Sequence, residues 1–127
     1  MSDIEQVEEA IDRLIGIDRS MCGNELILQG YVDQLDTGDE WDRMEVQRHI
    51  DAYRHELGQA STWFVMEMNA VIYHGQKLID EWRDTDLMMI GRKYSVDAPF
   101  YKRAQDEWPE VTKNPVWVML RSSGVPF

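Results

Sequence analysis

Residues 39–84 read DEWDRMEVQRHIDAYRHELGQASTWFVMEMNAVIYHGQKLIDEWRD, and this proline-free stretch decides the fold. A row of apolar residues recurs in it at seven-residue intervals, as Ile50, Leu57, Phe64, Val71 and Leu78. Residues seven apart lie two turns apart on the same side of an α-helix. The stretch therefore predicts one very long helix over residues 40–84, or two helices joined by a break at Gly58 or Gly75.

The length of this helix is a constraint in itself. At 1.5 Å per residue it would span roughly 65 Å if unbroken. A compact chain of 127 residues has a radius of gyration of only ~14 Å. The helix must therefore bend, break or protrude. Because protrusion would leave an apolar seam in solvent, we expect a homodimer.

A second row in the same stretch changes character half-way along. It begins apolar and then turns polar, in the order Val46, Tyr53, Ala60, Glu67, His74, Glu81. One hypothesis is that Glu67, His74 and Glu81 line a groove that binds a small ligand or handles protons. The other is that the helix rotates, so that these side chains reach solvent while Met68, Gly75 and Trp82 take over the packing. A straight helix drifts about 20° per heptad, which favours rotation.

The N-terminal segment predicts another long helix. Ser2 and Glu5 have the spacing of a capping box. A heptad row follows as Val7, Leu14, Met21, Leu28 and Leu35, and its partner row holds Ile4, Ile11 and Val32 but is interrupted by Asp18 and Glu25. The continuous phase indicates that residues 3–36 lie on nearly one axis.

Glycines leave a second possibility open for this segment. Gly16, Gly23 and Gly30 recur every seven residues on the opposite side, and each costs about 1 kcal/mol relative to alanine in a helix interior. Either another helix backbone approaches them closely, or the segment breaks near Gly16 or Gly23.

The remaining elements are set by turn residues and prolines. Residues 36–39 form a turn signal at which the chain reverses, and Thr85 and Asp86 suggest another turn before the short apolar run 87–90. All four prolines lie in the last 29 residues, where one helix is expected from Asp97 to Glu107 and another between Asn114 and Gly124, with a buried strand over 116–120 as the alternative. This tail should fold back as a lid anchored by Trp108 and Trp117.

These signals together predict an all-α fold in a single domain of residues 1–127. It would be an antiparallel helical hairpin or bundle, made of an acidic first helix or helix pair over 1–36, the long helix within 39–84, and a lid of short helices within 85–127.

Charge is distributed unevenly along the chain. The net charge is −11. Through Asp51 there are 14 acids against 4 arginines, whereas from Ala52 onward there are 10 acids and 9 bases. Such an acidic half repels phosphate and attracts basic protein surfaces. It could equally be a solvated face that keeps the protein soluble. The basic pairs at 92–93 and 102–103 could close onto the acidic N-terminal helix.

No catalytic or metal-binding motif can be written for this chain. His55 and Glu56 begin the H-E-x-x-H pattern, but Gln59 stands where the second histidine is required. The carboxylate pairs of Glu81 with Asp84 and Glu5 with Glu8 are common in any acidic chain. We expect no metal and no cofactor, and the balance is against an enzyme. Cys22, the single cysteine, is predicted to be a small buried hydrophobe.

The sequence therefore predicts an interaction protein with a basic protein partner and no direct contact with nucleic acid or membrane. Its start lacks the pattern of a signal peptide, so the cytoplasm is the expected location. In kind it is similar to the compact acidic inhibitors of phages and mobile elements, which mimic nucleic acid and occupy basic clefts, a likeness of size, helicity and charge alone. The alternatives are the ligand groove and a structural subunit of a larger assembly. The expected partner-binding residues are Glu8, Glu9, Asp12, Asp33, Asp36, Asp39, Glu40 and Asp42.

Overall fold

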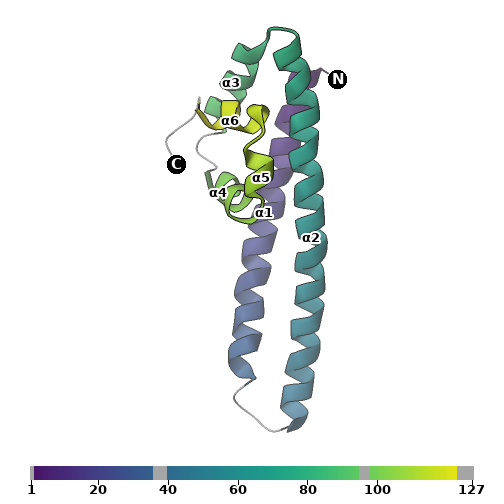
Figure 1. Ribbon diagram of the computed structural model, residues 1–127. Helices are drawn as coiled ribbons and strands as arrows, with labels where there is room; N and C mark the ends of the chain where they lie inside the picture. The colour runs from purple at the N-terminus through teal and green to yellow at the C-terminus, as the bar shows by residue number, and fades with distance from the viewer. Residues whose placement is uncertain (1, 36–39, 95–97, 123–127) are drawn as a thin grey trace.

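The fold was analysed in a computed structural model, which describes residues 2–35, 40–94 and 98–122 (Figure 1). All regular structure within these residues is helical, which confirms the predicted all-α class. The helices are α1 (Asp3–Gln34), α2 (Glu40–Asp80), α3 (Asp84–Lys93), α4 (Ala98–Glu107), α5 (Pro109–Thr112) and α6 (Pro115–Ser122).

Helices α1 and α2 form a long antiparallel hairpin. Asp3 bonds to His74, Arg13 bonds to Glu67, and Tyr31 stacks on Tyr53. As the residue number rises along α1, the number of the contacted residue falls along α2, so the helices run side by side in opposite directions (Figure 1). The turn predicted at 36–39 lies outside the described residues.

Helix α1 begins where the capping box predicts and continues without a break. The Ser2 hydroxyl accepts a hydrogen bond from the Glu5 amide at 3.2 Å, which satisfies one of the free amides of the first turn. The predicted break near Gly16 or Gly23 is wrong. The alternative, in which another helix of the chain approaches these glycines closely, is also wrong for the described residues. A Cβ added at Gly16, Gly23 or Gly30 would meet nothing within 4 Å.

Helix α2 is also continuous, so the predicted break at Gly58 or Gly75 is wrong. Its 41 residues span about 61 Å. Gly75 has a packing role instead, because a Cβ there would lie 2.5 Å from Cγ1 of Val116 on α6. The chain accommodates its overlong helix by protruding.

Helix α2 ends at Asp80, four residues before the end predicted at residue 84. The Arg83 amide donates to the Leu78 carbonyl at 2.7 Å and the Trp82 amide donates to the Ile79 carbonyl at 3.1 Å. This is a Schellman cap, and it places Trp82 in the left-handed region with φ 60°. The turn predicted at Thr85 and Asp86 is therefore wrong, since both residues belong to α3.

The C-terminal segment forms the predicted lid, and residues 116–120 are helical rather than a strand. The Asn114 side chain caps α6 by accepting from the Val116 amide at 3.0 Å. Trp117 is buried and its Nε1 donates to the Met68 carbonyl at 3.4 Å. The Trp108 ring stacks on Phe64 with 5.0 Å between ring centroids. Both tryptophans therefore anchor the lid as predicted.

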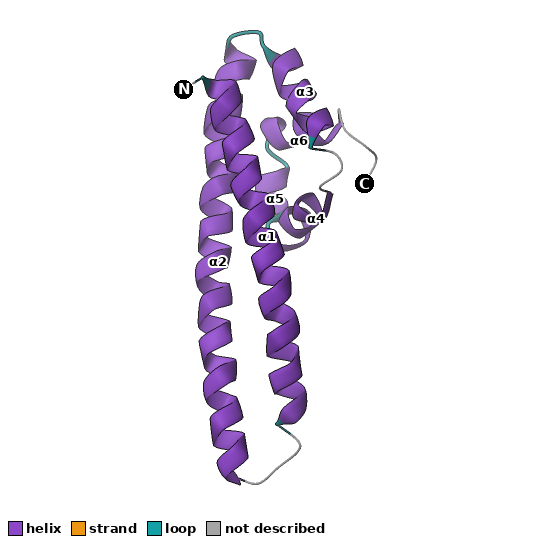
Figure 2. Cartoon of the chain, turned by 180° about the vertical axis from the view of Figure 1, so that it is seen from behind, coloured by secondary structure: helices purple, strands orange, loops and turns teal. Residues whose placement is uncertain are grey.

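The lid covers only one end of the hairpin (Figures 1 and 2). The main core lies there, among buried side chains of α1, α2, α3, α4 and α6. We define the distal arm as residues 26–34 of α1 with residues 40–57 of α2. Ile50 is the one fully buried side chain within these two ranges. Beside it, Tyr31 stacks on His49 and Tyr53, with ring centroids 4.7 and 5.8 Å apart.

Candidate interaction surfaces

The acidic residues predicted to bind a partner do not form one continuous surface. Glu8 pairs with Lys93 at 2.7 Å and Glu9 with Arg13 at 3.7 Å, both near the N-terminal end of α1. Asp33 lies 24 positions beyond Glu9, or about 36 Å along the helix axis.

The remaining predicted residues divide between the two ends of the hairpin. Asp12 is exposed near the N-terminal group, and Glu40 and Asp42 are exposed in the first turn of α2 at the distal end. Asp36 and Asp39 lie outside the described residues. Partner binding by this set stays a prediction, with the N-terminal group partly engaged in holding the lid.

Arg103 of α4 is the strongest electrostatic link between the lid and α1. Its guanidinium donates to Asp18, to Glu25 at 2.6 Å and to Glu107 at 3.2 Å. Burial on its own would lower the pKa of Arg103, but the hydrogen bonds to Asp18 and Glu25 outweigh it and raise that pKa. The hydrogen bonds therefore reinforce the charged form of a side chain that is already protonated in proteins. Asp18 and Glu25 interrupt the apolar row of α1 because they bind this arginine.

A second pair joins the lid to the acidic helix, so the predicted closure of basic residues onto α1 is confirmed for Lys93 and Arg103. The hydrogen bond from Lys93 to Glu8 raises the pKa of the lysine. The prediction for Cys22 is wrong. This thiol is exposed, and its Sγ accepts a hydrogen bond from Arg103 at 3.3 Å.

The polar row of Glu67, His74 and Glu81 is not brought together into one ligand groove. Glu67 pairs with Arg13 at 2.9 Å, His74 Nδ1 lies 2.9 Å from Asp3, and Glu81 lies 3.9 Å from its near neighbour Arg83. Each side chain is thus directed to a different partner.

The rotation hypothesis is confirmed only in part, because Glu67 and His74 remain half-buried and only Glu81 of the polar row is exposed. Met68 and Gly75 are buried as expected. Trp82, however, is 91% exposed because it lies in the cap beyond the end of the helix.

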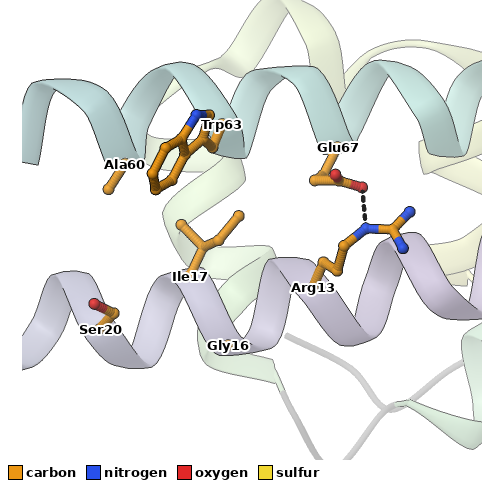
Figure 3. Close-up of a pocket in the computed structure, with 7 residues that line it drawn as sticks. All are labelled: Arg13, Gly16, Ile17, Ser20, Ala60, Trp63 and Glu67. Atoms are coloured by element: carbon orange, nitrogen blue, oxygen red, sulfur yellow. Dashed lines mark hydrogen bonds and ion pairs between the residues drawn. The ribbon is translucent and has the colours of Figure 1, made fainter.

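A different groove lies between α1 and α2 (Figure 3). Its volume is about 510 Å³. The ring of Trp63 lies along it, and the Arg13–Glu67 ion pair crosses between the helices beside it (Figure 3). The other lining residues are Gly16, Ile17, Ser20 and Ala60.

Helical spacing alone does not decide which large apolar side chains of this part of α2 are buried. Trp63 and Met66 are 57% and 62% exposed, whereas Phe64 and Met68 are buried. Helical spacing was compatible with either row, and only the position of the lid decides between them.

The distal arm carries a second set of exposed apolar side chains. Leu26 is 77% exposed and Trp41 is 69% exposed, and Ile27 and Met44 are also exposed. Trp41 and Met44 lie three residues apart and so share a face of α2. The arm has six acidic residues against three arginines. It therefore combines apolar anchors with an acidic surplus.

Two findings bear on the kinds of site available. Among residues 2–35, 40–94 and 98–122, no three histidine, cysteine, aspartate or glutamate side chains cluster as a metal site requires. None of the helices in these ranges has the length and apolar character needed to cross a bilayer.

Comparison with known proteins gives no family to which the chain can be assigned. No family model matches it, and neither do any curated protein or any solved structure.

Proposed function

We propose that this chain is a protein–protein interaction module whose distal arm binds a partner protein. The observation that carries the proposal is that the lid ends half-way along the hairpin, while the arm beyond it exposes Leu26, Trp41 and Met44. Tryptophan and methionine are enriched in protein interfaces, and a few such anchors dominate binding energy.

The charge of the arm supports a partner with a basic surface. The six acids of the arm and its three arginines leave an acidic surplus around the apolar anchors. A complementary partner surface is apolar at its centre and basic at its rim. Nucleic-acid-binding proteins offer basic surfaces of this kind, so inhibition by occupying such a surface is the narrower form of the proposal.

The test compares proteins captured by the wild-type chain and by a double variant, Trp41→Ala with Met44→Ala. Both side chains are exposed, so the fold should tolerate their loss. A true partner should be captured by the wild type and lost with the double variant. The matched control is Trp82→Ala, which removes a more exposed tryptophan from the other end of α2.

The acidic contribution is tested separately with the purified partner. Reversing charge with Glu40→Lys and Asp42→Lys should slow association and flatten its salt dependence, because rim charges act mainly on the association rate. A partner bound equally well by the wild type and by the Trp41/Met44 variant would show that the arm is not the binding surface.

A further inference from the structure

Among the described residues, no side chain of the lid lines the Trp63 groove. The lid contacts α1 through Glu8 and Asp18 and contacts α2 through Phe64 and Met68, and none of these four residues lines the groove. We call the side of the hairpin that holds this groove the lid-free face and define it by Gly16, Ser20, Gly23 and Ile27 of α1 with Trp63, Met66 and Tyr73 of α2. The last three are all more than half exposed.

The two helices of the lid-free face have opposite shapes. On α1, a Cβ added at Gly16 or Gly23 would meet nothing within 4 Å, so the helix surface at these glycines is uncovered and has no projecting side chain. On α2, Trp63, Met66 and Tyr73 project as large side chains, at spacings of three and seven residues that keep them on one side. A surface with projections on one helix and hollows on the other is self-complementary.

A two-fold axis parallel to the hairpin brings these shapes together. It places α2 of each copy against α1 of the other, at the same height along the axis. Because Arg13 is level with Glu67 within one chain, Trp63 is level with residues 16–20. The same symmetry would therefore set the indole of one copy over Gly16 and Ser20 of the other.

We propose that the lid-free face binds a second copy of this chain, with Trp63 of each copy packed over Gly16 and Ser20 of the other. From the height of Tyr73 to that of Ile27 the face is about 30 Å long, and at about 20 Å wide it offers about 600 Å² per copy. Two copies would bury about 1,200 Å² in total, which is the lower end of the range for specific, stable interfaces. The charges at the groove would not be left unpaired, because Arg13 and Glu67 already neutralise each other at 2.9 Å.

The test measures molar mass and the dimer dissociation constant by sedimentation. The wild type should be a dimer, and Gly16→Leu should raise the dissociation constant by about tenfold or more by filling the hollow. The same substitution should raise the melting temperature of the monomer, because leucine favours helix and nothing crowds this position. Gly58→Leu is the matched control, since that glycine is also open but lies outside the groove. It should stabilise the helix and leave the dimer intact.

Trp63→Glu gives an independent arm of the test and should abolish the dimer while preserving the helical content. A wild-type chain that stays monomeric up to about 100 µM overturns the proposal and leaves the face to a helix of another protein. A dimer that tolerates both Gly16→Leu and Trp63→Glu overturns it as well.

Salt separates this inference from the proposed function. Two copies of net charge −11 repel each other, so added salt should strengthen the dimer. Binding of a basic partner to the distal arm should instead weaken with salt. Trp41→Ala and Met44→Ala should leave the dimer unchanged, so either proposal can fail while the other stands.

Discussion

At the scale of single residues, Trp82 occupies a position that normally belongs to glycine. The C′ residue of a Schellman cap has positive φ, which costs an L-residue roughly 1–2 kcal/mol, and Trp82 has φ 60° with its side chain in solvent. Trp82→Gly should therefore raise the free energy of unfolding by about 1 kcal/mol and the melting temperature by about 4 °C. Trp82→Ala is the control, because alanine keeps the Cβ and should gain little. Equal melting temperatures for the glycine and alanine variants would contradict this account.

Tyr101 gives the fold a defined sensitivity to alkali. Burial raises the pKa of its hydroxyl above the ordinary value of 10.0. The unfolded chain therefore loses this proton from about pH 10 while the folded chain retains it, so stability is complete below pH 10 and falls above it, by up to about 1.4 kcal/mol per pH unit.

The contribution of Tyr101 can be isolated by urea unfolding at a series of pH values between 8 and about 11.5. Tyr101→Phe should flatten the alkaline decline, whereas Tyr73→Phe, at an exposed position, should not. The pKa of Lys93 is also raised, so this residue too makes stability fall as the pH rises. Its effect is the same in the wild type and in both tyrosine variants, and it therefore cancels from the comparison. A decline unchanged by Tyr101→Phe would exclude this residue as its source.

At the scale of elements, the Asp18–Arg103 pair joins α1 to α4. The Asp18 side chain is 7% exposed and that of Arg103 is 11% exposed, so removing either partner leaves a charge with little access to water. Asp18→Leu or Arg103→Met alone should lower the free energy of unfolding by about 3 kcal/mol.

The double variant should lose less free energy of unfolding than the two single variants lose together. Leucine at position 18 restores the apolar row of α1, and methionine can pack against it in place of the ion pair. A double-mutant cycle by urea unfolding gives the coupling energy. Additive losses would show that Arg103 acts mainly through its exposed partners, Glu25 and Glu107.

Sequence periodicity predicted the elements well because it is a local property. Seven-residue rows identified both long helices, and caps at Ser2 and Asn114 located two helix starts. The meaning of individual glycines could not be predicted, because it depends on distant contacts. The space beside Gly75 is filled by the side chain of Val116, which lies 41 positions later in the sequence. The space beside Gly16 is open.

The candidate surfaces were harder to predict for the same reason. Trp63 and Phe64 are adjacent and both fit an apolar row, yet only Phe64 faces the lid. The sequence shows that Asp18 and Glu25 interrupt the apolar row of α1. It does not show the reason, which is that both carboxylates bind Arg103 of α4. The sequence therefore predicted which segments form helices but not which side chains from different helices contact each other.

At the scale of the whole molecule, the hairpin has unequal stability along its length. The covered half buries Leu14, Phe64 and Val71 in the main core, whereas the distal arm buries Ile50 alone. Helices in water depend on tertiary packing for most of their stability. The arm should therefore open without unfolding the rest of the protein.

Hydrogen exchange followed by mass spectrometry measures this difference directly. At a concentration where the chain is monomeric, amides of residues 26–34 and 44–57 should exchange well before those of residues 7–21 and 64–78, which open only with the whole fold. Uniform protection along α1 and α2 in the monomer would contradict the division into a core and an arm. A partner that covers the distal arm should slow exchange there selectively. A second copy on the lid-free face should instead protect residues around Gly16 and Trp63, so the same measurement distinguishes the two surfaces.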